Sequence, residues 1–426
     1  MVIKVYGFST QNNGCGKYRV WEPLDAIKRH GLAEVEREPA EPGSISIERA
    51  DKIFRENDVV FCQPFSEIWA AAIFMAARDE HKKKLIVDLD DNVWAVQPMN
   101  VGPIQGQLTS LKSQFSGKFE DFWKLEPIEK RQIREYAARI DGTVVKQDDG
   151  KLFFLKNKRP DVKLAVEFMI SEADAVTTTN EALAKVLREH TDKPVFVLPN
   201  CLDLRKWQKP ALSREKLWIS WCGSVSHYPD LKPLMPALDN LMRKHPDLNV
   251  QIMGSSFDYL FPLKEGSKAL PVAGYGPEDG MFYADVKDSG ERWPGRMLYD
   301  KPVPVQEFDA WMSSSWQGHI GIAPIEANAF NDSKSELKWL EYTAMGIPVV
   351  ASDFGPYKRA ITNGVDGFLV NGADWWEITI DQLLKKPELR LSIAYSAYEK
   401  LQQHYDINHQ AIKWIEVFNS VVACQR

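Results

Sequence analysis

Two lysines and a glutamate in the C-terminal half of the chain have the spacing of a site for a phosphorylated, hydroxylated ligand. Lys338 and Glu341 stand four and seven residues after Lys334, in a segment that we expect to form a helix beginning near Ser335. At about 100° per residue the three side chains fall on one face, and the helical rise separates Lys334 from Glu341 by about 10 Å. The ammonium groups would bind phosphate, and the carboxylate would accept hydrogen bonds from ribose hydroxyls. The alternative is a set of solvated charges on an amphipathic helix.

The elements around these residues make a βαβ unit. A strand ends near Pro324, a loop follows, and Gly346 closes the helix before a buried strand at residues 347–352. Ligands of open α/β sheets bind outside the carboxyl ends of the strands. The helix N-terminus adds N–H groups and a partial positive charge that favour a phosphate. Asn331 and Ser335 flank this helix start and join the two lysines as candidate ligand-binding residues.

A glycine-containing loop after the first strand is a second, weaker candidate. Residues 2–8 have the pattern of a buried strand, and the loop that follows contains Gly14, Gly16, Lys17 and Arg19. Glycines let the backbone approach a ligand closely. Lys17 and Arg19 carry charges that would attract a phosphate, although a surface role fits Arg19 as well.

Short apolar strands alternate with helices in both halves of the chain, which predicts two parallel sheets covered on both faces. A polar segment at residues 202–216 interrupts this alternation, and a fresh strand at 217–222 restarts it. We therefore expect an N-terminal Rossmann-like domain at residues 1–204 and a C-terminal one at 205–405. A last helix at 406–426 is expected to cross back to the N-terminal domain.

Two segments exceed this plan. Residues 100–163 are expected to be largely helical, and they are locally rich in Lys and Arg. Residues 264–309 form an irregular Gly/Pro-rich excursion that contains Arg292, Trp293 and Arg296. Long loops in compact domains are usually functional or disordered, so both segments could contact a ligand or partner.

The composition excludes several classes of protein. The chain has 426 residues, 44% of them hydrophobic, and a formal net charge of -6, so a surface that binds nucleic acid over most of its area is not expected. The five cysteines form no CxxC pair, which argues against a disulfide framework and a zinc site. We find no signal-peptide pattern and no apolar run long enough to span a bilayer. A soluble protein of the cytoplasm, in a bacterium or a phage-infected host, is the simplest expectation.

The run around Glu341 resembles the donor-binding element of retaining GT-B glycosyltransferases, especially glycosyltransferase family 4. In that family a Glu precedes a small-residue turn and a G-x-P-V-V strand, and Glu341 stands in this relation to Gly346, Pro348 and Val350. The resemblance implies two Rossmann-like domains facing a cleft. It also implies that Glu341 holds the ribose of a nucleotide-sugar donor, most simply a UDP-sugar. No further cofactor is implied.

The chain departs from the family pattern where the family contacts the sugar. A second Glu is common eight residues before the first, but Ser333 stands there. Glu326 and Asn328 are therefore candidate sugar contacts, with Asn331 as a third.

The chain also departs from the family where the family grips the diphosphate. An Arg and a Lys are usual after the first strand of the C-terminal domain, but Ser224 and a site near Asp230 replace them here. The grip is then expected from Lys334, Lys338 and the backbone at Gly223 and Ser224. His227 could contact a phosphate or sugar, or cap the next helix. Gly254 ends the neighbouring predicted strand and joins the candidate donor-binding residues.

The form G-S-x-x-H-x-x-D-L, paired with N-x-x-K-S-x-L-K-x-L-E-Y, is typical of a branch with many bacterial and phage members. An acidic cluster in the N-terminal half, Asp88, Asp90 and Asp91, looks like a set of metal ligands. We prefer a helix or turn cap for it, because the family needs no catalytic metal in general. Residues 197–203 resemble the interdomain segment of the family, with Cys201 in place of Gly.

These observations predict a hexosyl- or pentosyl-transferase that moves sugar from a nucleotide donor to a hydroxyl acceptor with retention of configuration. The acceptor has two candidates: hydroxymethylated bases in phage DNA, met by the basic segment 100–163, or a cell-surface polysaccharide or lipid-linked sugar. A basic segment that is only a solvated decoration is an equal alternative. A third hypothesis is an inactive sugar-nucleotide-binding protein. No integral membrane contact is expected.

Overall fold

Two six-stranded parallel sheets organise the chain. The computed structural model describes residues 2–10, 12–39, 45–65, 68–95, 143–146, 153–156, 162–213, 215–224, 227–254, 270–271, 282–283 and 293–424. One unit comprises Met1–Ala95, Gly106–Asn200 and Ile407–Arg426, and the other comprises residues 96–105 with Cys201–Asp406. We call them the N-terminal and the C-terminal unit.

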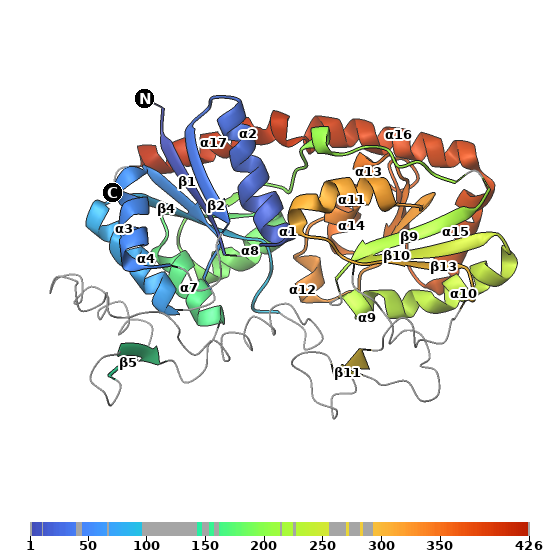
Figure 1. Ribbon diagram of the computed structural model, residues 1–426, viewed down its shortest axis with the longest axis horizontal. Coiled ribbons are helices and arrows are strands. Elements are labelled where there is room, and N and C mark those ends of the chain that lie inside the picture. The colour runs from blue at the N-terminus through green and yellow to red at the C-terminus, as the bar shows by residue number, and fades with distance from the viewer. Residues whose placement is uncertain are drawn as a thin grey trace. The chain divides into compact units, whose positions relative to one another are not determined.

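The N-terminal unit has its strands in the order β2-β1-β3-β4-β7-β8. All of its strand pairs are parallel. The strands are β1 (Lys4–Ser9), β2 (Glu34–Pro39), β3 (Val59–Cys62), β4 (Lys84–Leu89), β7 (Ala175–Thr178) and β8 (Val195–Val197). The helices are α1 (Gly14–Gly16), the π-helix η1 (Lys17–Trp21), α2 (Glu22–Arg29), α3 (Ile47–Glu56), α4 (Ile68–His81), α7 (Val162–Glu172), α8 (Glu181–His190) and α17 (Ile407–Ala423). Helices α3, α4 and α7 cover one face of the sheet, and α2 and α17 cover the other (Figure 1).

The last helix, α17, belongs to the N-terminal unit. The ring of Phe61 on β3 lies 5.7 Å from that of Trp414 and 5.2 Å from that of Phe418, centroid to centroid. Both α17 rings are buried. The chain therefore returns to its first domain at its end, as the sequence predicts.

Arg19 holds the carboxyl edge of this sheet together. Its side chain is fully buried and donates two hydrogen bonds to Asp88, at 3.0 and 2.7 Å. A third N–H group donates to the carbonyl of Leu198 at 2.5 Å and to Asn200 at 3.2 Å. The guanidinium lies 4.9 Å from the ring centroid of Trp414. Both hypotheses for Arg19, a surface side chain and a phosphate contact, are therefore wrong, because its pairing is with residues far away in the sequence.

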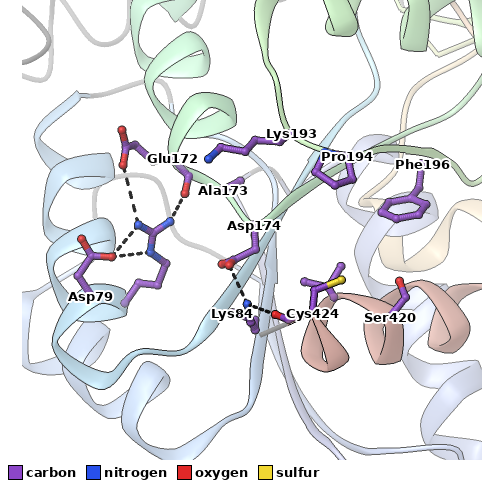
Figure 2. A pocket seen from close by; sticks show the side chains of 12 residues that line it. Asp79, Lys84, Glu172, Ala173, Asp174, Lys193, Pro194, Phe196, Ser420 and Cys424 are labelled. Carbon is purple, nitrogen blue, oxygen red and sulfur yellow. Dashed lines mark hydrogen bonds and ion pairs between the residues drawn. The ribbon is translucent and has the colours of Figure 1, made fainter. Parts of the chain in front are cut away.

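A cavity of about 430 Å³ lies at the opposite edge of the same sheet, where β4, β7 and β8 begin (Figure 2). Lys84 donates to Asp174 at 3.2 Å and to the carbonyl of Cys424 at 2.9 Å. The Arg78 guanidinium donates to Asp79 and to the carbonyl of Glu172. Helices α7 and α17 end here, so these cations bind carbonyl groups that the helices leave unpaired. The contacts that line this cavity therefore fix the C-terminal end of α17 to the sheet.

The C-terminal unit has its strands in the order β13-β10-β9-β14-β15-β16, all parallel. The strands are β9 (Leu217–Gly223), β10 (Leu248–Gly254), β13 (Met297–Asp300), β14 (Ile320–Ala323), β15 (Val349–Ser352) and β16 (Phe368–Val370). The α-helices are α9 (Tyr228–Leu231), α10 (Met235–Lys244), α11 (Phe308–Ser315), α12 (Ala329–Asp332), α13 (Leu337–Ala344), α14 (Gly355–Ala360), α15 (Ala373–Lys385) and α16 (Pro387–His404). Three short helical turns, η3 (Leu204–Lys206), η5 (Lys232–Leu234) and η9 (Val305–Glu307), link them. Helices α10 and α15 share one core with the sheet, while α13 packs against α16. Two doubly wound Rossmann-like units confirm the predicted fold class.

The two additional segments lie mostly outside the described residues. In the basic segment, the described β5 (Thr143–Lys146) and β6 (Phe153–Lys156) pair as antiparallel strands, so the expectation of helix is wrong for these residues. Most of the second excursion, Arg292 included, is outside the described residues, apart from β11 (Leu270–Pro271), β12 (Phe282–Tyr283) and the part from Trp293 onward.

Arg19→Met tests how far the N-terminal unit depends on the Arg19–Asp88 pair. Removing one partner leaves a buried carboxylate without its counter-charge, so we expect a loss of about 3–5 kcal/mol in unfolding free energy. The matched control is Arg37→Met. The Arg37–Asp25 pair has a similar 2.6 Å contact but 31% and 37% exposed side chains, and its loss should cost about 0–1 kcal/mol. Hydrogen exchange of the β3 and β4 amides along a urea series measures both, and equal losses would contradict the prediction.

Candidate functional site

Two neighbouring strands of the C-terminal unit both end in glycine. Gly223 ends β9 and pairs in register with Gly254 at the end of β10. A Cβ on Gly254, whose φ is +97°, would lie 2.4 Å from the carbonyl oxygen of Gly223. A Cβ on Gly223 would lie 2.6 Å from the ring of Trp221. The sequence therefore needs glycine at both positions, and both lie at the edge where open α/β sheets bind ligands.

The segment after β14 differs from the predicted single helix. Asn328 caps a short helix, α12, by accepting a hydrogen bond from the N–H of Asn331 at 2.8 Å. A turn then leads into α13, which begins at Leu337. Lys334 therefore lies in the turn before α13, and its ammonium lies 4.5 Å from the ring centroid of Phe330. The prediction that Lys334 shares one helical face with Lys338 and Glu341 is wrong, because Asn328 starts a separate short helix and the next helix begins only at Leu337.

Helix α13 is fixed against the end of β9. The hydroxyl of Tyr342 accepts a hydrogen bond from the N–H of Cys222 at 2.9 Å. Its ring packs so closely on β14 that a Cβ on Gly321 would lie 2.5 Å from it. Glu341 is buried, with 5% of its surface exposed. These contacts hold Lys338 and Glu341, three residues apart on α13, beneath the ends of β9 and β14.

Lys338 is a partly buried cation with few partners. Its ammonium lies 3.3 Å from Nε2 of His227 and 5.4 Å from the ring centroid of Trp221. A Cβ on Gly223 would lie 3.1 Å from the same nitrogen, so the ammonium reaches the bare strand end. Burial lowers the pKa of Lys338, and the nearby Glu341 opposes that effect. Within the described residues Lys338 forms no ion pair, and an ammonium group has three N–H bonds to donate.

His227 lies between Lys338 and a buried carboxylate. Its Nδ1 lies 2.7 Å from Oδ2 of Asp230. Burial, first, and the positive charge of Lys338 together lower the pKa of His227 to about 4. The imidazole is therefore neutral at neutral pH.

Asp230 joins this pair to the loop after β14. Its Oδ1 accepts hydrogen bonds from the N–H of Glu326 at 2.7 Å and from the amide of Asn331 at 3.2 Å. Asn331 also donates to the carbonyl of Glu326 at 2.9 Å. Sequence reasoning gave Asp230 no role. The available signal was its place three residues after a histidine at the start of a helix, the spacing at which two side chains meet.

The other candidates in this unit divide by exposure. Asn328 and Asn331 spend polar atoms on the loop itself, as a helix cap and as a donor to Asp230. The side chain of Glu326 is exposed, and that of Ser335 is partly exposed. Ser224 is exposed at the end of β9. Backbone and carboxylate groups at this edge thus remain open to a ligand.

The candidates in the N-terminal unit lie in helical turns rather than in an open loop. Gly14 and Gly16 form α1, which Asn13 caps by accepting from the N–H groups of Cys15 and Gly16. Lys17 is 4% exposed, and its ammonium pairs with Glu22 at 3.2 Å. The charge of Lys17 is therefore already matched inside the protein.

The three carboxylates of the acidic cluster, Asp88, Asp90 and Asp91, do not act as one group. Asp88 is the partner of Arg19 and also accepts a 2.6 Å hydrogen bond from Thr177. Burial, first, and the negative charge of Asp91 together raise the pKa of Asp90 to about 6. In the part of the chain that the structure describes, no three His, Cys, Asp or Glu side chains gather as metal ligands would. A search of the same residues finds no helix with the length and hydropathy that crossing a bilayer requires.

Part of the C-terminal unit is similar in sequence to known proteins. Residues 337–400, which begin with α13, match the family model described as glycosyl transferases group 1. A D-inositol 3-phosphate glycosyltransferase of Frankia alni is 32% identical over 101 residues, and that alignment spans 23% of each chain. The matched part is thus about a quarter of the length of this curated relative.

Solved structures are similar along nearly the whole chain. HepE of Anabaena, solved in complex with UDP-glucose, has a TM-score of 0.56 at 12% identity, with 98% of this chain and 100% of that chain covered. Sucrose-phosphate synthase of Thermosynechococcus elongatus has a TM-score of 0.55 at 11% identity, with coverage of 99% and 100%. At such identities the likeness shows the fold alone. The chain thus has a GT-B-like fold, and its residues 337–400 resemble the glycosyl transferases group 1 family.

Proposed function

We propose that this protein transfers a sugar from a nucleotide-sugar donor to a hydroxyl group, and that the donor diphosphate binds at Lys338. One observation carries the proposal. The Lys338 ammonium is partly buried, and its hydrogen-bond partner among the described residues is a neutral imidazole rather than a carboxylate. Buried charges are normally paired, so a cation left in this state is suited to an anionic ligand.

The surroundings of Lys338 fit a diphosphate. Gly223 has no side chain beside the Lys338 ammonium, so the backbone at the end of β9 can approach the same ligand. Lys334 lies close enough to lower the pKa of both His227 and Lys338, so it adds a second positive charge to the same place. Departure of the nucleotide puts negative charge on the diphosphate, and fixed positive groups stabilise that charge in the transition state.

Glu341 supplies the second half of the donor site. A buried carboxylate can accept two hydrogen bonds from vicinal ribose hydroxyls, and Glu341 is one helical turn from Lys338. A UDP-sugar is the donor that we propose, because the structurally similar HepE was solved with UDP-glucose and with UDP. The exposed carboxylate of Glu326 is the proposed contact for the sugar itself. No further cofactor enters this scheme.

Retention of the anomeric configuration completes the proposed reaction. The leaving phosphate can take the proton of the attacking hydroxyl on the same face of the sugar, so the scheme needs no separate base. For the acceptor we retain the hydroxymethylated base of phage DNA, with a polysaccharide or lipid-linked sugar as the alternative. Incubation with labelled nucleotide sugars and either acceptor class tests these options, and donor hydrolysis alone separates an enzyme from an inactive binder. Binding of DNA through phosphates would weaken steeply between two salt concentrations.

Lys338→Met is the direct test of the diphosphate site. We expect turnover to fall about 100- to 1,000-fold, because one preorganised charge on the leaving group is lost. Lys334→Ala should also depress turnover strongly. Lys358→Met is the matched control, since Lys358 lies on another helix, α14, is 64% exposed and pairs with Asp353. Initial rates of transfer or donor hydrolysis and calorimetric UDP affinities measure all three, and near-normal values for Lys338→Met would remove the site.

Glu341→Gln tests the ribose contact. The amide keeps the shape of the side chain but has one acceptor oxygen, so we expect UDP to bind about 10-fold more weakly. The matched probe is 2′,3′-dideoxyuridine diphosphate, which lacks both hydroxyls. The wild type should distinguish the two ligands, and the variant should bind both about equally, as a double-mutant cycle requires for a direct contact. Equal discrimination by the two proteins would place the ribose elsewhere.

A further inference from the structure

We propose that His227 and Asp230 are positioning residues for the donor: Asp230 holds His227, and His227 holds Lys338 with its remaining N–H bonds available at the end of β9. The inference rests on the proposed donor site and goes beyond it, because it gives two residues that need not touch the ligand a role in orienting the cation.

The direction of the hydrogen bonds follows from the chemistry of the groups. An ammonium group only donates, so Nε2 of His227, 3.3 Å from Lys338, must accept. A neutral imidazole that accepts at Nε2 carries its proton at Nδ1. That proton points at Asp230, whose carboxylate oxygen lies 2.7 Å away and can only accept. The three side chains therefore form one chain of hydrogen bonds with a single direction.

The arrangement requires a neutral imidazole. The charged groups that face His227 are Lys338 on α13, Lys334 in the turn before it, and Asp230 on α9, while Trp221 covers it at 5.9 Å between ring centroids. A second proton at Nε2 would remove the acceptor for Lys338 and put two cations in contact. The depressed pKa of His227, about 4, agrees with this requirement.

The second oxygen of Asp230 attaches the His227–Asp230 pair to the loop after β14. It binds the N–H of Glu326 and the amide of Asn331, so the loop after β14 and the segment after β9 share one carboxylate. Asp230 is 6% exposed, and both of its oxygens have hydrogen-bond partners. The cation is thus oriented before a ligand arrives, which lowers the reorganisation needed in the transition state. Residues 224–231, which follow β9, contain no lysine or arginine. His227 and Asp230 of this segment instead orient a lysine that α13 supplies.

A pair of substitutions separates orientation of Lys338 from support of the loop. His227→Gln can place its carbonyl oxygen near the position of Nε2 and keep an acceptor for Lys338. His227→Asn can place its amide near Nδ1 and keep a donor to Asp230 while losing the contact with Lys338. We expect the Gln variant to stay within about 5-fold of the wild-type kcat and the Asn variant to lose about 10- to 100-fold, with a smaller change in the KM for donor. The reverse order would show that His227 only supports the loop, and would overturn the proposal.

Lys338→Met in the same series keeps this proposal separable from the donor site. Normal UDP affinity in Lys338→Met would overturn the donor site itself, whatever the His227 variants do. Loss of affinity in Lys338→Met together with wild-type rates in both His227 variants would overturn the positioning role alone. Circular dichroism and thermal unfolding of each variant exclude loss of fold as the cause.

Nitrogen NMR of the histidine side chains gives a readout that does not depend on activity. We expect His227 to carry its proton at Nδ1 and to stay neutral as the pH falls from 7 to 5, because its pKa is lowered to about 4. The stability difference between the wild type and His227→Gln should change in the same window. The unfolded chain binds a proton at His227 near pH 6.5 while the folded chain does not, so the wild type loses stability relative to the variant as the pH falls from about 6.5 to 4. A protonated ring at pH 6, or a proton at Nε2 at pH 7, would overturn the proposal.

Discussion

The buried carboxylate of Asp230 is the interaction on which the candidate site depends. Its two oxygens connect three separate parts of the chain: His227 after β9, Glu326 after β14, and Asn331 in α12. Burying a carboxylate costs free energy unless its oxygens accept hydrogen bonds. Asp230 therefore needs these contacts, and in accepting them it also fixes the three segments. The parallel sheet makes the meeting possible, because strands that run in one direction bring all their following loops to one edge.

Buried cations in the two units differ in how fully they are satisfied, and that difference separates structure from function. Arg19 donates to a carboxylate, a carbonyl and an amide, and an aromatic ring covers it. Lys17 is paired with Glu22. Lys338 has a neutral imidazole as its partner and a bare strand end beside it. A cation whose N–H bonds all have acceptors stabilises the fold, whereas a cation with N–H bonds still available can bind an anionic ligand.

Local sequence patterns predicted most strands of the two sheets, because these depend on short-range hydrophobic periodicity. The return of the last helix to the N-terminal unit is instead what the family resemblance implies. The same patterns placed Lys338 and Glu341 on one helix. They failed at Lys334, because Asn328 starts a separate short helix, α12, and α13 begins only at Leu337. They failed also at Arg19, whose partner Asp88 is 69 residues away, since nothing in the neighbourhood of an arginine shows which distant carboxylate it will meet. The two partners of Asp230 in the loop after β14, Glu326 and Asn331, are equally remote in the sequence.

The position of a charge in space matters more for such a site than its position in the sequence. Ser224 and Asp230 stand where the resembling glycosyltransferases have basic residues, and sequence comparison alone makes this a loss of the phosphate grip. The structure puts the ammonium of Lys338 next to the end of β9 from a different element, α13. An acidic residue at 230 then fits the site, because a lysine in that place would repel Lys338 and could not accept a hydrogen bond from His227. The substitutions in the segment after β9 and the lysine on α13 therefore make physical sense only as one set.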